Sequence, residues 1–135
     1  MGLALAKTEQ ERLASLQSLQ LLDTPPAAMF DRITNLASFL FGSEIAVISL
    51  IDQDRQWFLS RQGLDATHTA REHAFCAVTI EEECELSVPD ASLDHRFATN
   101  PLVTGAPYIR SYLGHPVRCP EGYLIGALAV IDSSP

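Results

Sequence analysis

Two long apolar runs are the strongest pattern in this sequence. Residues 44–51 and 122–131 are apolar on both alternating faces, rather than on one face only. A strand of this kind needs cover on both sides of its sheet. A polar turn at 52–54 and a second strand at 55–61 follow the first run, which predicts a hairpin. The pattern therefore predicts a compact three-layer domain, a shape that favours an internal pocket.

Helical spacing marks two segments that precede the first strand. Thr8 with Glu11 three residues later is a capping-box pattern, and it predicts a helix over residues 8–22. A second helix is predicted from about Pro26 to Phe41, with Gly42 as its C-terminal stop. The helical apolar face of this second segment consists of Met29, Ile33, Leu36, Ala37 and Leu40. We expect the two helices to cover one face of the sheet.

The remaining predicted elements are short, apart from a second hairpin. Residues 63–71 have a loop composition, 72–77 a short helical pattern and 86–88 a short strand pattern. A helical turn is predicted at 93–100 and an irregular segment at 101–107. Strands at 108–117 and 122–131, joined by a turn at 119–122, form the second hairpin. Hairpins dominate, so the expected fold is α+β with a mainly antiparallel sheet and two long loops over its second face.

The composition is that of a single domain. The chain has 135 residues, of which 47% are hydrophobic and 19% charged, and we expect an N-terminal helix within 1–24 and a core over 25–132. A net charge of −8 disfavours binding to nucleic acid or an anionic membrane. We find no apolar run long enough to span a bilayer and no signal-peptide pattern. Three cysteines without a CxxC pair indicate no disulfide framework and a reducing, cytoplasmic setting.

Few residue patterns indicate catalysis. The sequence contains no GxxxxGK, GxGxxG or HExxH motif. His73 and Cys76 are three residues apart, but two ligands without a third favour a buried cysteine beside a capping histidine over a metal site. Cys76 lies in an apolar stretch, which favours an inert thiol, with a redox or adduct-forming role as the alternative. Cys84 is surrounded by glutamates, which raise the pKa of a thiol, so we expect it to be exposed and unreactive.

Several polar and aromatic residues have both a structural and a ligand-binding interpretation. Asp90 and Asp94 follow a strand and precede a helical turn, so they are either turn and cap residues or ligand contacts. Alternation along a strand would place Tyr108, Arg110 and Tyr112 on one face. Such a ladder suits a planar or anionic molecule, although stacking of arginine between aromatic rings is also a common structural feature. Trp57 is either a core residue or part of a ligand cage.

The order of these motifs resembles a GAF domain, of the kind found as the N-terminal sensor of bacterial diguanylate cyclases and sensor histidine kinases. The matching stretches are residues 21–26 (LLDTPP), 30–34 (FDRIT), 45–52 (IAVISLID), 54–58 (DRQWF), 75–77 (FCA), 88–90 (VPD), 94–97 (DHRF), 100–103 (NPLV), 109–110 (IR), 114–117 (GHPV) and 126–132 (GALAVID). The resemblance as a whole covers residues 13–132, nearly the whole chain.

The resemblance implies a central antiparallel sheet with helices on one face and loops around a small-molecule pocket on the other. It also implies a non-catalytic regulatory module in a cytoplasmic signalling protein, and dimerisation through terminal helices. Three family functions lack their residues here. The Asn-Lys…Phe…Asp-Glu signature of cyclic-nucleotide binding and the Cys-His dipeptide of bilin attachment are absent. Residues 105–108 (GAPY) hold no cysteine where the free methionine sulfoxide reductases carry their nucleophile.

We therefore predict a pocket between the sheet and the loops 63–79 and 90–108, for a small molecule that the sequence does not identify. The predicted lining residues are Trp57, Arg71, Phe75, Cys76, Asp90, Phe97, Tyr108, Arg110 and Tyr112. We also predict a homodimer through the helix at 8–22, because its leucines exceed what one core-facing stripe requires; these are Leu13, Leu16, Leu19 and Leu22. The alternatives are a structural dimerisation module with no ligand and, less favoured, a cysteine-based redox sensor or a free methionine sulfoxide reductase.

Overall fold

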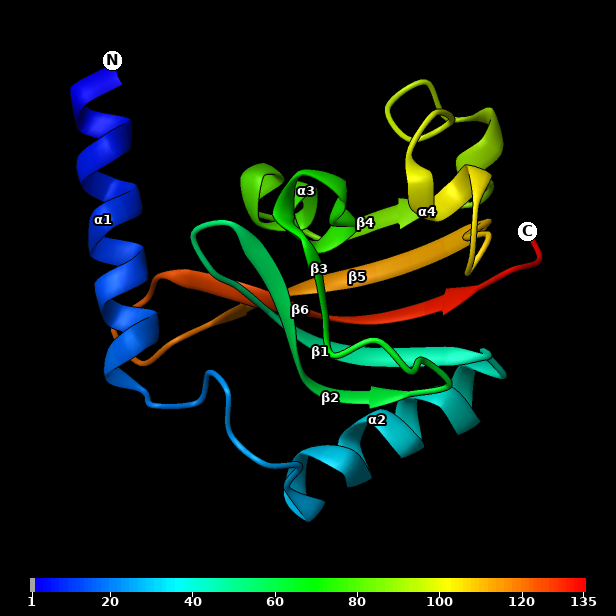
Figure 1. The fold of residues 1–135 in the computed structure, drawn as a ribbon, viewed down its shortest axis with the longest axis horizontal. Coiled ribbons are helices and arrows are strands. Elements are labelled where there is room, and N and C mark those ends of the chain that lie inside the picture. Colours follow the sequence, from blue (N-terminus) through cyan, green and yellow to red (C-terminus); the bar gives the residue numbers. More distant parts are fainter. Residues whose placement is uncertain (1) are drawn as a thin grey trace.

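The computed structural model describes residues 2–135, with side chains from residue 8 onward (Figure 1). Six strands form one sheet: β1 (Ile45–Ile51), β2 (Arg55–Gln62), β3 (His68–Ala70), β4 (Leu86–Val88), β5 (Ser111–Arg118) and β6 (Leu124–Asp132). Their order across the sheet is β3-β2-β1-β6-β5-β4. Every neighbouring pair is antiparallel, and both predicted hairpins, β1–β2 and β5–β6, are present. The predicted α+β fold around an antiparallel sheet is thus confirmed.

The two long apolar strands occupy the centre of the sheet. All seven residues of β1 are buried, as its run of apolar positions predicts. Two separate hydrophobic clusters form, one on each face of the sheet. One contains Val47 and Ile51 together with the aromatic residues Phe75, Phe97 and Tyr112, and the other contains Ile48 and Leu50 together with Trp57. Alternate residues of β1 therefore serve different cores, so this strand joins both halves of the interior.

The helices occupy different places around the sheet (Figure 1). They are α1 (Gly2–Ser18), α2 (Ala28–Phe41), α3 (Phe75–Glu82) and α4 (Pro101–Thr104), with short 3-10 turns η1 (Arg71–His73) and η2 (Ala91–Leu93). α2 lies across β1 and β2 on one face, and α3 covers β5 and β6 on the other. α1 stands at the end of the sheet where the turns of both hairpins lie. Among the described residues, no helix combines the length and hydropathy that crossing a bilayer requires.

The boundaries predicted for the first helix are wrong at both ends. α1 extends from Gly2 to Ser18, so Thr8 lies inside the helix and does not cap it. The chain leaves the helix through Gln20 and Asp23, which both have positive φ angles. The last of the four leucines, Leu22, therefore lies in the linker to α2, where it is partly buried against the second core. The predicted N-terminal helix within 1–24 exists, but it is displaced towards the N-terminus.

α2 is amphipathic, but its polar side faces the sheet and its apolar side faces the solvent. Its fully buried residue is a threonine, Thr34, whereas most of the predicted apolar face is exposed to solvent. The exposed members are Met29, Ile33, Leu36 and Leu40. Two further elements were not predicted: β3 lies within the expected loop 63–71, and α4 lies within the expected irregular segment 101–107. Asn100 caps α4 by accepting a hydrogen bond from the Leu102 N–H.

Candidate functional site

A small cavity of about 40 Å³ lies between the sheet and its covering segments on the face that α3 covers. Its walls come from β1, β2, β3, β5 and β6, from α3 and α4, from the loop after β2 and from residues 107–109. The lining residues are Ile45, Val47, Gln56, Phe58, Leu64, Thr69, Phe75, Cys76, Leu102, Pro107, Ile109, Tyr112 and Ile131. Most of these side chains are apolar. The Gln56 amide donates a hydrogen bond to the Thr69 hydroxyl over 3.0 Å, so the polar pair in the wall satisfies itself.

An aromatic and thiol cluster forms the α3 side of this cavity. The Phe75 ring stacks on Phe97, with centroids 4.1 Å apart, and it also contacts the Tyr112 ring at 5.2 Å. The Tyr112 hydroxyl lies 2.8 Å from the Thr79 hydroxyl and donates to the Cys76 Sγ over 3.3 Å. Burial raises the pKa of the Cys76 thiol and of the Tyr112 phenol. Both groups are therefore protonated near neutral pH, and Cys76 does not supply a thiolate nucleophile.

The segment that closes the cavity is fixed by side-chain hydrogen bonds to the backbone. Asn100 donates to the His73 carbonyl over 3.0 Å, which ties the start of α4 to η1. Arg110 donates to the carbonyl of Val103 over 3.0 Å and to that of Ile109 over 2.9 Å. The Arg110 guanidinium thus holds the α4 segment against the start of β5.

The predicted ladder of Tyr108, Arg110 and Tyr112 is wrong as a geometry. β5 begins at Ser111, and Tyr108 adopts a positive φ of 59°, outside the extended region that alternation requires. Tyr108 is 54% exposed, whereas Tyr112 is fully buried in the cavity wall. The chain turns within residues 105–109, so Tyr108 does not continue the strand that carries Tyr112. Proline and glycine in this segment were the available signal for that turn.

The nine predicted site residues are therefore distributed over several places. Phe75, Cys76 and Tyr112 line the cavity, and Phe97 lies directly behind Phe75. Asp90 caps η2 by accepting a hydrogen bond from the Ser92 N–H, which is its turn-forming interpretation. The remaining four lie elsewhere: Trp57, Arg71, Tyr108 and Arg110. Their role in ligand binding stays a prediction.

Sequence reasoning missed the residues that β1, β2 and β6 contribute to the cavity. Ile45, Val47 and Ile131 are on strands recognised from the sequence, and they share the face that α3 covers. Strand alternation alone would have found them once that face was known. Leu102 and Pro107 come from the segment expected to be irregular, where no periodic signal exists.

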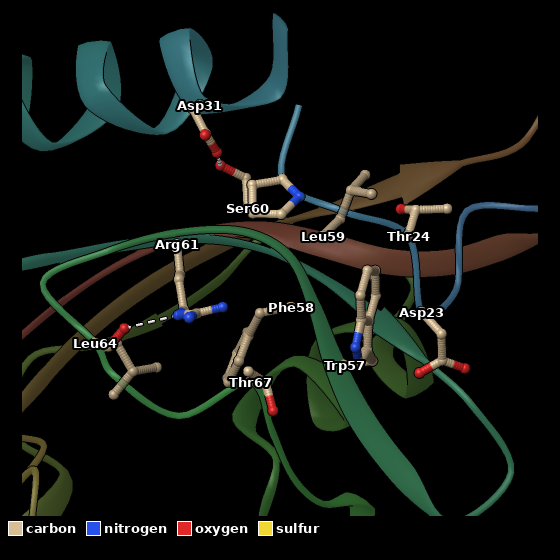
Figure 2. Close-up of a pocket in the computed structure, with 11 residues that line it drawn as sticks. Asp23, Thr24, Asp31, Trp57, Phe58, Leu59, Ser60, Arg61, Leu64 and Thr67 are labelled. Carbon is tan, nitrogen blue, oxygen red and sulfur yellow. Dashed lines mark hydrogen bonds between the residues drawn. The ribbon is translucent and has the colours of Figure 1, made fainter. Parts of the chain in front are cut away.

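A second and larger cleft of about 560 Å³ opens on the outside of β2 (Figure 2). Trp57 lies on one side of it, and the Arg61 guanidinium and the loop after β2 lie on the other. Arg61 donates through Nε to the Leu64 carbonyl over 2.9 Å, and Ser60 donates to Asp31 over 2.7 Å. The cleft is thus lined by residues of β2, by the loop that follows it, by the linker between α1 and α2 and by Asp31 of α2.

A network of hydrogen bonds connects η1, which precedes the cavity residue Phe75, to α1. Arg71, at the start of η1, donates to the Glu9 carboxylate over 2.7 Å and to the Asp52 carbonyl over 3.1 Å. Arg12 also donates to Glu9, through Nε and Nη2, and its Nη1 reaches the Ile51 carbonyl over 2.7 Å. The hydrogen bond from Arg12, aided by Arg71, lowers the pKa of Glu9 to about 2. This network could not be predicted from the sequence, because its residues come from three separate segments.

A third thiol, Cys119, joins α1 to the β5–β6 turn. Its Sγ lies 3.1 Å from the Ser15 hydroxyl, and that hydroxyl donates its proton to the Glu121 carboxylate over 2.9 Å. Burial raises the pKa of Cys119, but its hydrogen bond with the Ser15 hydroxyl and those with the backbone of the turn outweigh burial, so the pKa is lowered. Cys76, Cys84 and Cys119 are all free thiols. Within the described part of the chain, no group of three His, Cys, Asp or Glu side chains is arranged to hold a metal ion.

Comparisons with known proteins agree with this fold. The family model of the GAF domain matches residues 25–135. A cyclic di-GMP phosphodiesterase from Pseudomonas aeruginosa is 42% identical over 127 residues, which are 94% of this chain but 22% of that protein. The chain thus spans about a fifth of the length of this relative.

Solved structures with lower sequence identity share the same fold. The GAF domain of an Acinetobacter phosphoenolpyruvate-protein phosphotransferase aligns with a TM-score of 0.62 at 19% identity, covering 93% of this chain and 78% of that one. The free methionine-R-sulfoxide reductase of Neisseria meningitidis, in complex with its substrate, aligns with a TM-score of 0.63 at 19% identity, covering 95% and 76%. At such identities, the two structures support the fold alone.

Proposed function

Because this chain belongs to the GAF domain family, we propose that it is a regulatory module that senses a small molecule and controls the output of a larger signalling protein. The observation that carries this proposal is the coupling of the cavity's surroundings to α1. Arg71 precedes the cavity residue Phe75 by four positions and is hydrogen-bonded to Glu9 of α1. A ligand that moved α3 or η1 would therefore act on α1 through a direct contact.

The controlled output is the turnover of cyclic di-GMP. The relative from Pseudomonas aeruginosa supports this choice, since it is a cyclic di-GMP phosphodiesterase and matches nearly all of this chain. A diguanylate cyclase or a histidine kinase as output would use the module in the same way. The domain itself contributes no catalysis in this proposal, because the thiol in its cavity wall is buried and protonated.

The cavity determines which ligands fit. At about 40 Å³ it holds little more than a water molecule, so binding of a larger ligand requires some of the lining residues to move. The walls favour a compact, mainly apolar molecule, with the Phe75 ring as an aromatic contact and with the Gln56–Thr69 pair and the Tyr112 hydroxyl as its polar contacts.

A cavity-filling substitution tests this proposal. We expect native mass spectrometry of the chain, purified from its own host, to show a co-purified small molecule that is lost in Ile109→Trp. The indole fills the space beside Tyr112, while Leu93→Trp adds the same bulk at an exposed site and should leave the bound mass unchanged. Absence of any bound mass in the wild-type chain, or its retention in folded Ile109→Trp, would contradict a ligand in this cavity.

The small volume of the cavity favours a second candidate function, a structural module without a ligand. In that case the well-filled interior serves stability only, and the chain acts through its surfaces. The same pair of variants separates the two functions. A structural module would show no bound mass, and Ile109→Trp in the whole signalling protein would change its stability without changing its regulation.

A further inference from the structure

The outer edge of β2 is open beyond Phe58. β3 pairs with β2 only at Arg55, Gln56 and Trp57, and the Phe58 N–H donates to the Thr67 carbonyl over 3.0 Å. Beyond that point, no strand of the described chain pairs with β2 on the side away from β1. The cleft of about 560 Å³ in Figure 2, which we call the outer cleft, lies along this open edge. An open strand edge presents backbone N–H and C=O groups with which another extended chain can pair.

An extra residue in β2 directs the Arg61 side chain into the outer cleft. The register between β1 and β2 shifts at Leu59, which has no partner in β1. A bulge of this kind offsets the alternation of the side chains that follow it. Ser60 therefore contacts α2, whereas Arg61 donates through Nε to the Leu64 carbonyl in the loop after β2. With regular alternation, Arg61 would share the side of β2 that carries Leu59 and faces the second core.

Arg61 presents an unpaired cation to the outer cleft. Its Nη1 and Nη2 groups form neither an ion pair nor a hydrogen bond with any residue that the structure describes. These two groups lie side by side at the end of a planar guanidinium, an arrangement that matches the two oxygens of a carboxylate. In a chain with a net charge of −8, an arginine without a carboxylate partner is a specific place for an anionic group to bind.

Trp57 supplies a second free donor to the outer cleft. The residue is only 8% exposed, yet its indole N–H donates to no described residue, although a buried indole N–H normally has a partner. Over the described part of the chain, no fully buried side-chain nitrogen or oxygen lacks a hydrogen bond, so the Trp57 Nε1 must reach the cleft that this residue lines. In Figure 2 the ring nitrogen lies on the edge turned towards Phe58 and Thr67, away from Asp23.

The spacing of the two donors and the apolar lining define the shape of a ligand. Trp57 and Arg61 are four residues apart on a strand, so their Cα atoms are at most about 13 Å apart. The lining also includes Leu59, Leu64 and Pro26. A ligand that reaches both donors is therefore elongated. It carries an anionic group at one end, a hydrogen-bond acceptor at the other and apolar groups in addition.

The carboxylates of the outer cleft limit the charge of this ligand. Both oxygens of Asp23 accept hydrogen bonds from Arg55, each over 2.8 Å, so this charge is compensated. Asp31 accepts only from Ser60, over 2.7 Å, and it faces no cation among the described residues. Because Asp31 repels a second negative charge, the ligand should carry a single anionic group, at the Arg61 end.

We propose that the outer cleft binds the C-terminal end of a short, mainly apolar peptide, which extends along the open edge of β2. The terminal carboxylate accepts hydrogen bonds from Arg61, and a carbonyl oxygen upstream accepts one from the Trp57 indole. The apolar side chains of the peptide contact the leucine-lined walls. The outer cleft and the cavity on the other side of the sheet have only Phe58 and Leu64 in common, so this second site does not rest on the function proposed above.

Isothermal titration calorimetry of the 135-residue chain tests the proposal with N-acetyl-leucyl-leucine as the probe. This peptide has one terminal carboxylate, apolar side chains and an acetyl carbonyl upstream. We expect a dissociation constant of about 0.1–1 mM, typical of a small ligand held by few polar contacts. Its C-terminal amide is the matched ligand control, and it should bind about 10-fold or more weakly because it lacks the charge.

Variants of the two donors assign the binding to the outer cleft. Arg61→Gln should weaken binding of the acid about 10-fold or more and should leave the acid and the amide with the same dissociation constant. Trp57→Phe keeps an aromatic ring but removes the N–H, so it should weaken both ligands about 5-fold. Arg118→Gln is the control, since Arg118 is exposed at the end of β5 and also donates to one backbone carbonyl; it should leave both dissociation constants unchanged.

Circular dichroism shows that each variant is folded. The preference for the acid over the amide separates recognition by Arg61 from a structural role, because a rearranged loop would weaken both ligands alike. The proposal is overturned if the wild-type chain does not bind the probe at about 10 mM, well above the expected dissociation constant. It is also overturned if acid and amide bind the wild-type chain equally, or if folded Arg61→Gln keeps the wild-type preference for the acid.

Discussion

Glu9 is one of the residues that fix α1 to the rest of the molecule, since it accepts hydrogen bonds from both Arg12 and Arg71. Its carboxylate is charged in the folded state down to a pKa of about 2, below the usual 4.5. A carboxylate with a depressed folded-state pKa stabilises the fold above its unfolded pKa, and this contribution is lost as the pH falls towards the folded-state value. The relevant window is therefore between pH 4.5 and about 2.

The corresponding prediction concerns Glu9→Gln. We expect it to lower the free energy of unfolding at pH 7 by about 1 kcal/mol, a value reduced by solvent screening because the Glu9 side chain is 36% exposed. Urea denaturation at a series of pH values should show the difference from wild type shrinking below pH 4.5 and vanishing near 2. Glu85→Gln, at an exposed position, serves as the control. A difference that stays constant across this range would contradict the assigned role of Glu9.

Some single residues were predictable and others were not. The burial of Cys76 follows from its apolar neighbours, and the cap formed by Asp90 follows from its position after a strand. The pairing of Glu9 with Arg71 does not follow from local sequence, because it depends on how α1 meets η1, 62 residues away.

Among the secondary-structure elements, α2 shows what a periodic pattern predicts and what depends on the neighbouring elements. Helical spacing identified the helix and its apolar stripe correctly, but not the direction that the stripe faces. The direction depends on β2, whose Ser60 and Gln62 present polar groups towards the helix and require polar partners. The central strands were predictable because continuous apolar runs have one interpretation, whereas an amphipathic helix beside a polar strand has two.

This orientation predicts the sign of a stability change. Thr34→Val keeps the shape of the side chain but removes the hydroxyl that Ser60 and Gln62 contact, so we expect a loss of about 1–2 kcal/mol. If Thr34 were an ordinary core position, valine would stabilise the protein instead. Chemical denaturation of Thr34→Val distinguishes the two, with exposed Thr99→Val as the control. An unfolding free energy at or above that of wild type would argue against this account of α2.

Viewed as a whole, the molecule is one sheet with a hydrophobic core on each face. β1 contributes to both, so loss of either core should remove the support of the other. The family fold and the antiparallel sheet were predictable from motif order and hairpin patterns. The cavity was predictable only in part, because Gly105 and Pro107 signal a turn in the segment 101–109 but not how this segment packs on the sheet.

We therefore expect Leu16→Ala to destabilise the entire domain rather than α1 alone. Leu16 is fully buried in the core on the side of the sheet that α2 covers, so its truncation should lower the free energy of unfolding by about 2–5 kcal/mol. Calorimetry should show a single transition, at lower temperature than wild type, with equal calorimetric and van't Hoff enthalpies. Two resolved transitions, or an unchanged main transition, would show that α1 is an independent unit.

The position of Trp57 gives the protein a built-in optical reporter. It is the single tryptophan of the chain, it is 8% exposed, and it borders the outer cleft beside the linker that contains Asp23 and Thr24 (Figure 2). The emission wavelength of an indole depends on the polarity around it, so the tryptophan fluorescence of this protein reports on one defined site. Movement of the linker should shift the emission wavelength, whereas ligand binding confined to the inner cavity should leave it unchanged. Tryptophan fluorescence can therefore distinguish the outer cleft from the inner cavity without an added dye.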